Sequence, residues 1–430
     1  MGYSGVKQSH PSTEIRKADR GGFITLLLYV MAFLLFISTN SLYVLRGSIR
    51  TYTYLCIVAI AMALIFLVWR NVPVSRGFLR NYVVWPALVL LTFMLIGIGS
   101  ASFGGSSTAI AILLIISFPI FLHLLSSSGH VRGFLVAYCD VSFLFALLSL
   151  VLWLLGPVAG LISPNCSIVS TWNAQGIQLH TPGYFGLLYQ TQTVDFFGFH
   201  FIRNTGVFPE APMYSYALCI ALLFSYLGNL GTSFKNAIVG TTVLTTVSTT
   251  GIIVLFALIT FVLIKRAYQT AGGWRMLLLI LIGFLAFLIV LLVLSLFNAK
   301  LDSSSGSIRL DDYRAGFLAW QNNPIFGNGL GNSEIVKKYM SGFRSYNLGF
   351  SNSPMDILSR GGILFLLVFL IQIIGFLRWP SLQGKLSAGL FIFLWAVTIV
   401  TTLPITLLFF SFGTILIMGD AQTLRAGIGW

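Results

Sequence analysis

Long uninterrupted apolar runs recur along most of this 430-residue chain. Many of them approach twenty residues, the length of helix that crosses the hydrocarbon core of a bilayer. Because 57% of the residues are hydrophobic and only 8% are charged, no soluble protein of this size could bury so many apolar side chains. The runs also differ from the short alternating segments of a transmembrane barrel. The sequence therefore predicts an all-α integral membrane protein.

The apolar runs predict twelve membrane-spanning helices in one polytopic domain, residues 1–430. Because the first run lacks a small-residue cleavage site and many more runs follow it, we expect an uncleaved span rather than a signal peptide. The predicted spans are residues 22–39, 52–69, 83–100, 108–125, 134–155, 211–228, 234–247, 250–265, 275–297, 355–377, 386–401 and 403–419.

The basic residues predict how these spans are oriented. With the N-terminus inside, fifteen of the 25 Lys and Arg residues fall on the cytoplasmic side, nearly all beside span ends, as the positive-inside rule requires. Orientation thus accounts for the net charge of +14, which calls for no nucleic acid partner. Of the outer basic residues, only Arg46 and Arg50 lie in a short loop. We expect a multi-pass protein with both termini in the cytoplasm.

Two long segments, residues 156–210 and 298–354, face outward in this arrangement. They carry basic residues that orientation does not require, since long loops are translocated largely regardless of charge. The most charged stretch is SSGSIRLDDYRAGFLAWQNNPIFGNGLGN, residues 304–332. We therefore expect the chemistry of this protein on its outer face.

Within this stretch, the sequence predicts a helix with Ser307 as N-cap and a stop at Asn322-Asn323-Pro324. An apolar stripe suited to the membrane surface recurs along it at helical spacing. Arg309 would lie in the first turn, where the helix dipole disfavours a cation by up to about 1 kcal/mol. A bound anion such as phosphate would remove that penalty. Arg309 is thus the first candidate substrate ligand, and a solvated surface helix is the alternative.

Arg314 lies five residues further on, about 140° around the helix at roughly 100° per residue. It cannot point at the same small ligand as Arg309 while the helix is regular. Three residues separate it from Asp311, a spacing that favours an ion pair. We expect a mainly structural role for Arg314 and keep it as a second candidate for binding an anion.

A second polar cluster, Arg203-Asn-Thr-Gly-Val-Phe-Pro-Glu210-Ala-Pro, leads into the sixth predicted span. Arg203 and Glu210 would lie at the outer membrane boundary. Prolines on both sides of Glu210 fix its backbone, and a carboxylate there is a candidate general base. The alternative is an acidic residue at a helix N-terminus, favoured by the dipole alone.

The third cluster lies at the mouth of the tenth predicted span. Asp356 and Arg360 have the i, i+4 spacing of a simple ion pair. Ionisable groups that enter a span are also candidates for function. Asn352 precedes them, and Asp140, within the fifth predicted span, is a further candidate whose partner the sequence does not identify.

At these clusters the chain resembles the O-antigen polymerase (Wzy) family, within the superfamily that also holds O-antigen ligases. The motifs that carry the resemblance are Arg309, Tyr313 and Asn323-Pro324-Ile-Phe-Gly327-Asn-Gly329, similar to an Arg…aromatic…Pro-x-x-Gly-x-Gly signature; Arg203-x-x-Gly-x-Phe-x-Glu210, similar to an outer-loop motif; and Asn352…Leu358…Gly362-Ile363, similar to the end of the second outer loop.

The resemblance implies a GT-C-like glycosyltransferase in the bacterial inner membrane. It implies a metal-independent inverting transfer of a glycan from undecaprenyl diphosphate to a lipid-linked repeat unit, with no cofactor. Glu210 and Arg309 would be catalytic, and Arg203, Arg309 and Arg314 would bind the diphosphate. Membrane lipids and a chain-length-determinant co-polymerase are the implied partners.

Two other functions stay open at this point. An O-antigen ligase attaches glycan to lipid A core, but the ligase-like pattern has a His before Asn352, where this chain has Ser351. A flippase or transporter would also suit many spans. Transporters usually carry their functional polar residues near the membrane midplane, whereas most candidates here lie in outer segments and span mouths.

Overall fold

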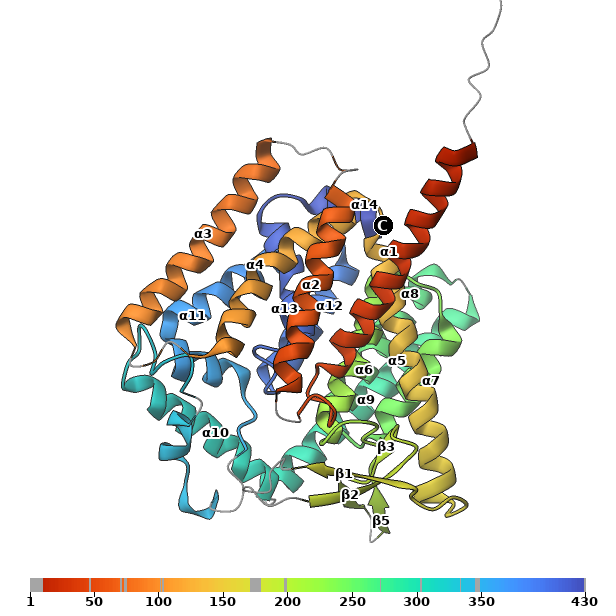
Figure 1. Ribbon diagram of the computed structural model, residues 1–430. Helices are drawn as coiled ribbons and strands as arrows, with labels where there is room; N and C mark the ends of the chain where they lie inside the picture. Colours follow the sequence, from red (N-terminus) through yellow and green to blue (C-terminus); the bar gives the residue numbers. More distant parts are fainter. Residues whose placement is uncertain are drawn as a thin grey trace, which may run out of the picture.

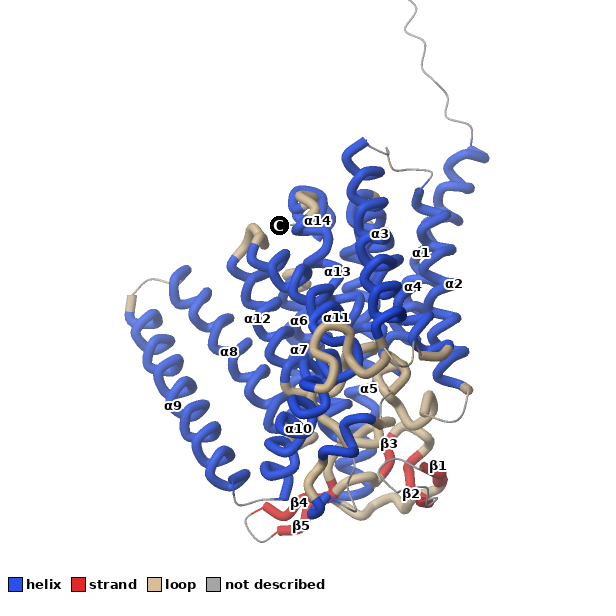
Figure 2. The backbone as a smooth tube through the Cα atoms, turned by 90° about the vertical axis from the view of Figure 1, so that its left-hand side faces the viewer, coloured by secondary structure: helices blue, strands red, loops and turns tan. Residues whose placement is uncertain are grey.

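The computed structural model describes residues 11–45, 48–69, 72, 76–100, 102, 104–170, 179–196, 199–270, 272–301, 304–332, 334–344 and 349–428. Most of these residues are helical, and the helices run side by side in a bundle (Figures 1 and 2). The helices are α1 (Pro11–Ile37), α2 (Ile49–Trp69), α3 (Arg76–Gly99), α4 (Ser106–Ser127), α5 (Val131–Trp153), α6 (Ala211–Leu227), α7 (Ser233–Thr245), α8 (Thr249–Gln269), α9 (Gly273–Leu301), α10 (Ser304–Gln321), α11 (Ser353–Leu377), α12 (Leu382–Ala396), α13 (Pro404–Ile417) and α14 (Ala421–Ile428), with the short helices η1 (Leu154–Val158), η2 (Ile335–Tyr339) and η3 (Gly342–Arg344).

Each predicted span coincides with one of these helices, and most of their ends agree within a few residues. Six helical stretches of the described chain are long and apolar enough to cross a bilayer: Ile49–Trp69, Tyr82–Gly99, Ser106–Ser127, Val131–Val158, Thr249–Gln269 and Ser353–Leu377. Several others are apolar but shorter. The chain is therefore a helical membrane protein, and the count of twelve spans stays a prediction.

The centre of the bundle is built from α6 and α13, whose residues are almost all buried, and from α4, most of whose residues are buried. Aromatic rings fill it: Phe409 of α13 stacks on Phe391 of α12 with 4.0 Å between ring centroids. Glycines let α11 and α13 approach closely, because a Cβ on Gly413 would overlap the backbone of Gln372. Small residues at such crossings are typical of packing between membrane helices.

The structure is mostly helical, in agreement with the predicted fold class, and the first long segment adds a few short strands. Strands β1 (Cys166–Ser170), β2 (Leu179–Tyr184) and β3 (Leu188–Tyr189) form an antiparallel sheet in the order β1-β2-β3. Strands β4 (Thr193–Phe196) and β5 (Phe199–Ile202) form a separate antiparallel pair, with Thr193 opposite Ile202. These small sheets cap one end of the helical bundle (Figure 2).

Both long outer segments lie at the same end of the molecule. Figure 1 shows the strands and α10 together at one end, with the start of α1 and the C-terminal helix α14 at the other. This arrangement agrees with the prediction that the two segments lie on the same side of the membrane. Which side of the membrane that is stays a prediction.

Candidate functional site

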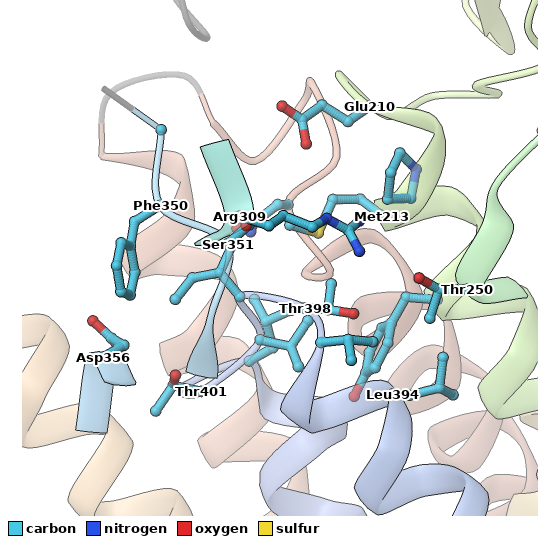
Figure 3. Close-up of a pocket in the computed structure, with 18 of the residues that line it drawn as sticks. Glu210, Met213, Thr250, Arg309, Phe350, Ser351, Asp356, Leu394, Thr398 and Thr401 are labelled. Atoms are coloured by element: carbon cyan, nitrogen blue, oxygen red, sulfur yellow. The ribbon is translucent and has the colours of Figure 1, made fainter. Parts of the chain in front are cut away.

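A cavity of about 630 Å³ lies where the outer segments meet the bundle (Figure 3). Its walls come from the starts of α2, α6 and α8, and from α10, η2 and α11. The link between α12 and α13 completes the lining. Among the predicted site residues, the cavity brings together Glu210, Arg309, Asp356 and Arg360. It does not include Arg203, Arg314, Asn352 or Asp140 in its lining.

Arg309 reaches the cavity from the second turn of α10, not from the first turn as predicted. The helix begins at Ser304, three residues before the predicted cap, so the argument from the helix dipole fails for Arg309. The helix ends at Gln321, in agreement with the predicted stop. Figure 3 shows the Arg309 side chain stretched across the cavity, with Glu210 on one side and Thr398 on the other. Within the described residues, its guanidinium makes no hydrogen bond or ion pair.

Arg314 lies on a different face of α10. Its side chain is 61% exposed and pairs with Asp311 at 3.5 Å, as predicted from the spacing, and it also donates to the Ser341 hydroxyl at 3.0 Å. Helix geometry thus separated the two arginines correctly. The predicted apolar stripe is exposed too, with Leu310 and Phe317 turned away from the protein interior.

The opposite face of α10 is held by a buried charge cluster that the sequence did not reveal. Arg344, whose side chain is fully buried, donates to Asp312 at 2.8 Å and lies 3.5 Å from Asp311. Asp312 also accepts hydrogen bonds from the Ser351 N–H at 3.0 Å and hydroxyl at 2.6 Å. The cluster therefore joins α10, η3 and the segment leading into α11, and it fixes the helix that carries Arg309.

The two carboxyls of this cluster are shifted in opposite directions. Burial raises the pKa of Asp311, but the hydroxyl and N–H of Ser341 and the charges of Arg344 and Arg314 outweigh it, so the net pKa is lowered. The pKa of Asp312 is raised because its burial outweighs the donors that it faces, Ser351 and Arg344. Removal of one member of such a buried cluster leaves an uncompensated charge, which is strongly destabilising.

Glu210 lies immediately before α6, where its extended backbone starts the helix. Its carbonyl accepts the first helical hydrogen bond, from the Met213 N–H at 3.1 Å, while its side chain makes no capping bond. The carboxylate is instead part of the cavity wall (Figure 3). Glu210 therefore lies at a helix N-terminus and also presents its carboxylate to the cavity, so its position is compatible with both alternatives that the sequence left open.

Arg203 lies near Glu210 but does not line the cavity. It donates to the carbonyls of Thr246 at 2.8 Å and Val247 at 3.0 Å, and to the side chain of Gln192 at 3.3 Å. Burial lowers the pKa of Arg203 to about 10, an effect that nearby Glu210 opposes. The structure thus places Arg203 as a brace between β5 and the turn from α7 to α8, and its predicted contact with substrate has no counterpart in the cavity.

Helix α11 is interrupted at Gly362, and the glycine-rich loop after α10 packs into the break. Gly362 has φ 63°, and a Cβ there would overlap the Ile325 carbonyl. The Asn328 N–H donates to Ser359 O at 3.0 Å and the Gly329 N–H to Arg360 O at 2.9 Å. The loop therefore satisfies backbone groups that the break exposes. The glycine run thus forms a turn that approaches the backbone of α11 closely.

The first half of α11 carries the third predicted cluster. Arg360 faces Asp356 at 3.4 Å and donates from Nε to the Leu330 carbonyl at 2.9 Å. Both side chains line the cavity. Asn352 caps this half-helix, accepting from the Met355 N–H at 3.1 Å.

Asp140 lies elsewhere, within α5. It accepts from Lys235 at 2.6 Å and from the Tyr29 hydroxyl at 2.8 Å, so α1, α5 and α7 meet there. The structure supplies the partners that the sequence could not, and they do not belong to the cavity lining.

The floor of the cavity is the non-helical link between α12 and α13. All seven residues from 397 to 403 line the cavity, whereas the predicted spans had most of them in helices. Helices α12 and α13 have 15 and 14 residues, fewer than the about twenty that cross a bilayer. Non-helical backbone inside a membrane bundle is tolerated where it lines a polar cavity. Thr401 is buried there with a hydroxyl that has no partner among the described residues.

Comparison with known proteins gives one match. Residues 236–370 match the family model described as O-Antigen ligase. No curated protein and no solved structure matches the chain. The matched segment contains Arg309, the glycine-rich loop and the first half of α11, but it does not reach Glu210. It supports the resemblance for the two motifs within this segment, where the chain is similar to the O-antigen ligase and polymerase superfamily, and it does not test the motif from Arg203 to Glu210.

Proposed function

We propose that this protein is an O-antigen polymerase. It transfers a growing glycan from undecaprenyl diphosphate onto a lipid-linked repeat unit, at the periplasmic face of the inner membrane. The observation that carries the proposal is Arg309: it lies in the segment matched by the family model and lines a cavity shared with Glu210. Its guanidinium has no acidic partner among the described residues, so an anionic substrate can supply one.

The chemistry assigns one role to each of these groups. The acceptor hydroxyl oxygen forms a bond to the anomeric carbon of the donor sugar as the bond from that carbon to the diphosphate oxygen breaks. The electron pair leaves on the diphosphate, where Arg309 stabilises the developing negative charge. The hydroxyl proton passes to the Glu210 carboxylate. Attack from the side opposite the leaving group inverts the anomeric centre.

The oily bundle suits a substrate with long polyprenyl chains, which would share the membrane with lipids. The proposal keeps three further expectations from the family resemblance: a GT-C-like architecture, independence from metal, and a chain-length-determinant co-polymerase as partner.

Ligation of glycan to lipid A core is the second candidate, because the matching family model is described as O-Antigen ligase. The residue before Asn352 argues against it. The ligase-like pattern has His there, whereas Ser351 of this chain gives both its N–H and its hydroxyl to the buried Asp312. A general base at that position is therefore missing, and we assign the role to Glu210, since the other two carboxylates of the lining, Glu334 and Asp356, pair with Lys337 and Arg360.

Gene deletion followed by gel analysis of lipopolysaccharide separates the candidates. We expect core carrying a single repeat unit in the deletion strain. Bare core would instead indicate a ligase or a flippase. Complementation with Arg309→Ala should also give the one-unit pattern at normal protein levels, whereas Lys338→Ala, an exposed residue outside the cavity lining, should restore the ladder. A full ladder from Arg309→Ala would overturn the proposal.

A further inference from the structure

Four basic side chains line the cavity, and two of them form ion pairs with carboxylates of the same lining. Lys337 pairs with Glu334 at 2.6 Å and Arg360 with Asp356 at 3.4 Å. Glu210, the remaining carboxylate of the lining, lies near Arg203, which does not line the cavity. The other two cations, Arg309 and Arg50, have no acidic partner within the described residues. Within the described residues, the cavity lining therefore contains two cations that no carboxylate pairs with.

Arg50 belongs to neither of the two long outer segments nor to the segment matched by the family model. It is the second residue of α2, in the short connection from α1. Its guanidinium donates to the side-chain oxygen of Asn40, a neutral acceptor at the end of that connection's first turn. One such bond leaves most of its five N–H donors for another ligand.

The position of Arg50 is unfavourable by two independent criteria. The first turn of a helix repels a cation through the helix dipole. Arg50 lies in the first turn of α2, whereas Arg309, for which the sequence predicted such a position, lies in the second turn of α10. The positive-inside rule also disfavours basic residues in a short outer loop. Arg46, the other basic residue of this loop, lies outside the described residues. A cation kept at such a place and turned into a cavity is explained by an anion that binds there.

We propose that Arg50 is a second ligand for the phosphate groups of the lipid-linked substrate, acting from the wall of the cavity contributed by α2 while Arg309 acts from α10. This inference rests on the proposed function and deepens it. Two guanidiniums can share the charge of a diphosphate, because each donates in a planar fork that matches phosphate oxygens. The exposed N–H groups at the start of α2 add to the attraction for an anion.

The inference is tested by binding to the purified full-length protein in detergent. Farnesyl diphosphate serves as the probe, because it carries the same diphosphate on a shorter prenyl chain. Arg50→Ala and Arg309→Ala should each weaken its binding by about 10- to 100-fold, the cost of losing a charge-assisted hydrogen bond. Lys338→Ala should bind the probe like the unmodified protein. Farnesol, which lacks phosphate, should bind weakly and without regard to Arg50.

Two conservative variants separate a ligand from a purely structural residue. Arg50→Gln keeps an N–H donor for Asn40 but removes the charge, and it should lose binding as Arg50→Ala does. Arg50→Lys keeps the charge and should retain most of the affinity. Wild-type affinity in Arg50→Gln, at an unchanged melting temperature, would overturn the inference.

Failure of the inference can be told apart from failure of the proposed function. If Arg309→Ala abolishes both probe binding and the lipopolysaccharide ladder while the Arg50 variants change neither, only the role of Arg50 is wrong. If the gene deletion leaves bare core, the polymerase assignment is wrong whatever Arg50 binds.

Discussion

At the residue scale, burial and pairing decide which charges remain available to a substrate. Arg309 and Arg314 are five residues apart on one helix, yet one lines the cavity and the other is an exposed partner of Asp311. Asp356 and Arg360 line the cavity but already neutralise each other. Counting charges in the sequence could not separate these cases, because the separation depends on which face of each helix is packed.

The buried carboxyls beside α10 predict how stability depends on pH. Because the folded-state pKa of Asp311 is lowered, its contribution is present above the unfolded value of about 3.9 and is lost as the pH falls through the folded value. At pH 7, Asp311→Asn should therefore destabilise the protein by about 1.5–3 kcal/mol, as loss of charged hydrogen bonds does.

Melting temperatures in detergent, measured from pH 7 down to about pH 3, test this expectation. The difference between the unmodified protein and Asp311→Asn should shrink towards the acid end. Asp312 shares Arg344 with Asp311, so the comparison reports the titration of Asp311 together with its coupling to Asp312. A difference that stays constant over the whole range would contradict the assignment of a lowered pKa to Asp311.

At the element scale, the site depends on the interruption of helix α11 at Gly362. The loop after α10 fills the break of α11 at Gly362, and the same contact places Arg360 against the Leu330 carbonyl. Half-helices at such breaks present side chains and backbone groups to a cavity. The first half of α11 thus owes its position to a segment more than thirty residues earlier in the chain.

Substitution of Gly362 tests this dependence. Gly362→Ala adds a Cβ that overlaps Ile325, at a φ of 63° that side chains rarely adopt. We expect a loss of at least about 2 kcal/mol in stability, from backbone strain and the overlap together, together with loss of the polymer ladder. The matched control is Gly389→Ala within α12, where a Cβ meets nothing within 4 Å. Equal melting temperatures for the two variants would show that the break does not need a glycine.

At the scale of the whole molecule, hydropathy was enough to predict where the helices lie in the sequence, but not how they pack together or which residues line the cavity between them. The apolar runs predicted the bundle, and four of the predicted site residues meet in one cavity. The non-helical floor of the cavity was not predicted because residues 397–403, VTIVTTL, contain no charged residue and continue the apolar runs of the spans on either side. The small sheets could not be predicted because their strands are short. The burial of Arg344 could not be predicted because a cation in a short helix such as η3 has no sequence signature of its own.

The functional proposal requires the cavity end of the molecule to face the periplasm, and this sidedness can be measured directly. The four cysteines would first be replaced, since Cys56 is exposed on α2 and Cys166 is partly exposed in β1. In that background, a membrane-impermeant maleimide added to cells with a permeabilised outer membrane should label Lys338→Cys, which lies at the cavity end. It should not label Lys385→Cys, an exposed residue at the start of α12, until the inner membrane is opened. Labelling in the reverse order would mean that the cavity faces the cytoplasm. It would contradict the functional proposal, because a cavity on that side could not receive a glycan that has already been translocated.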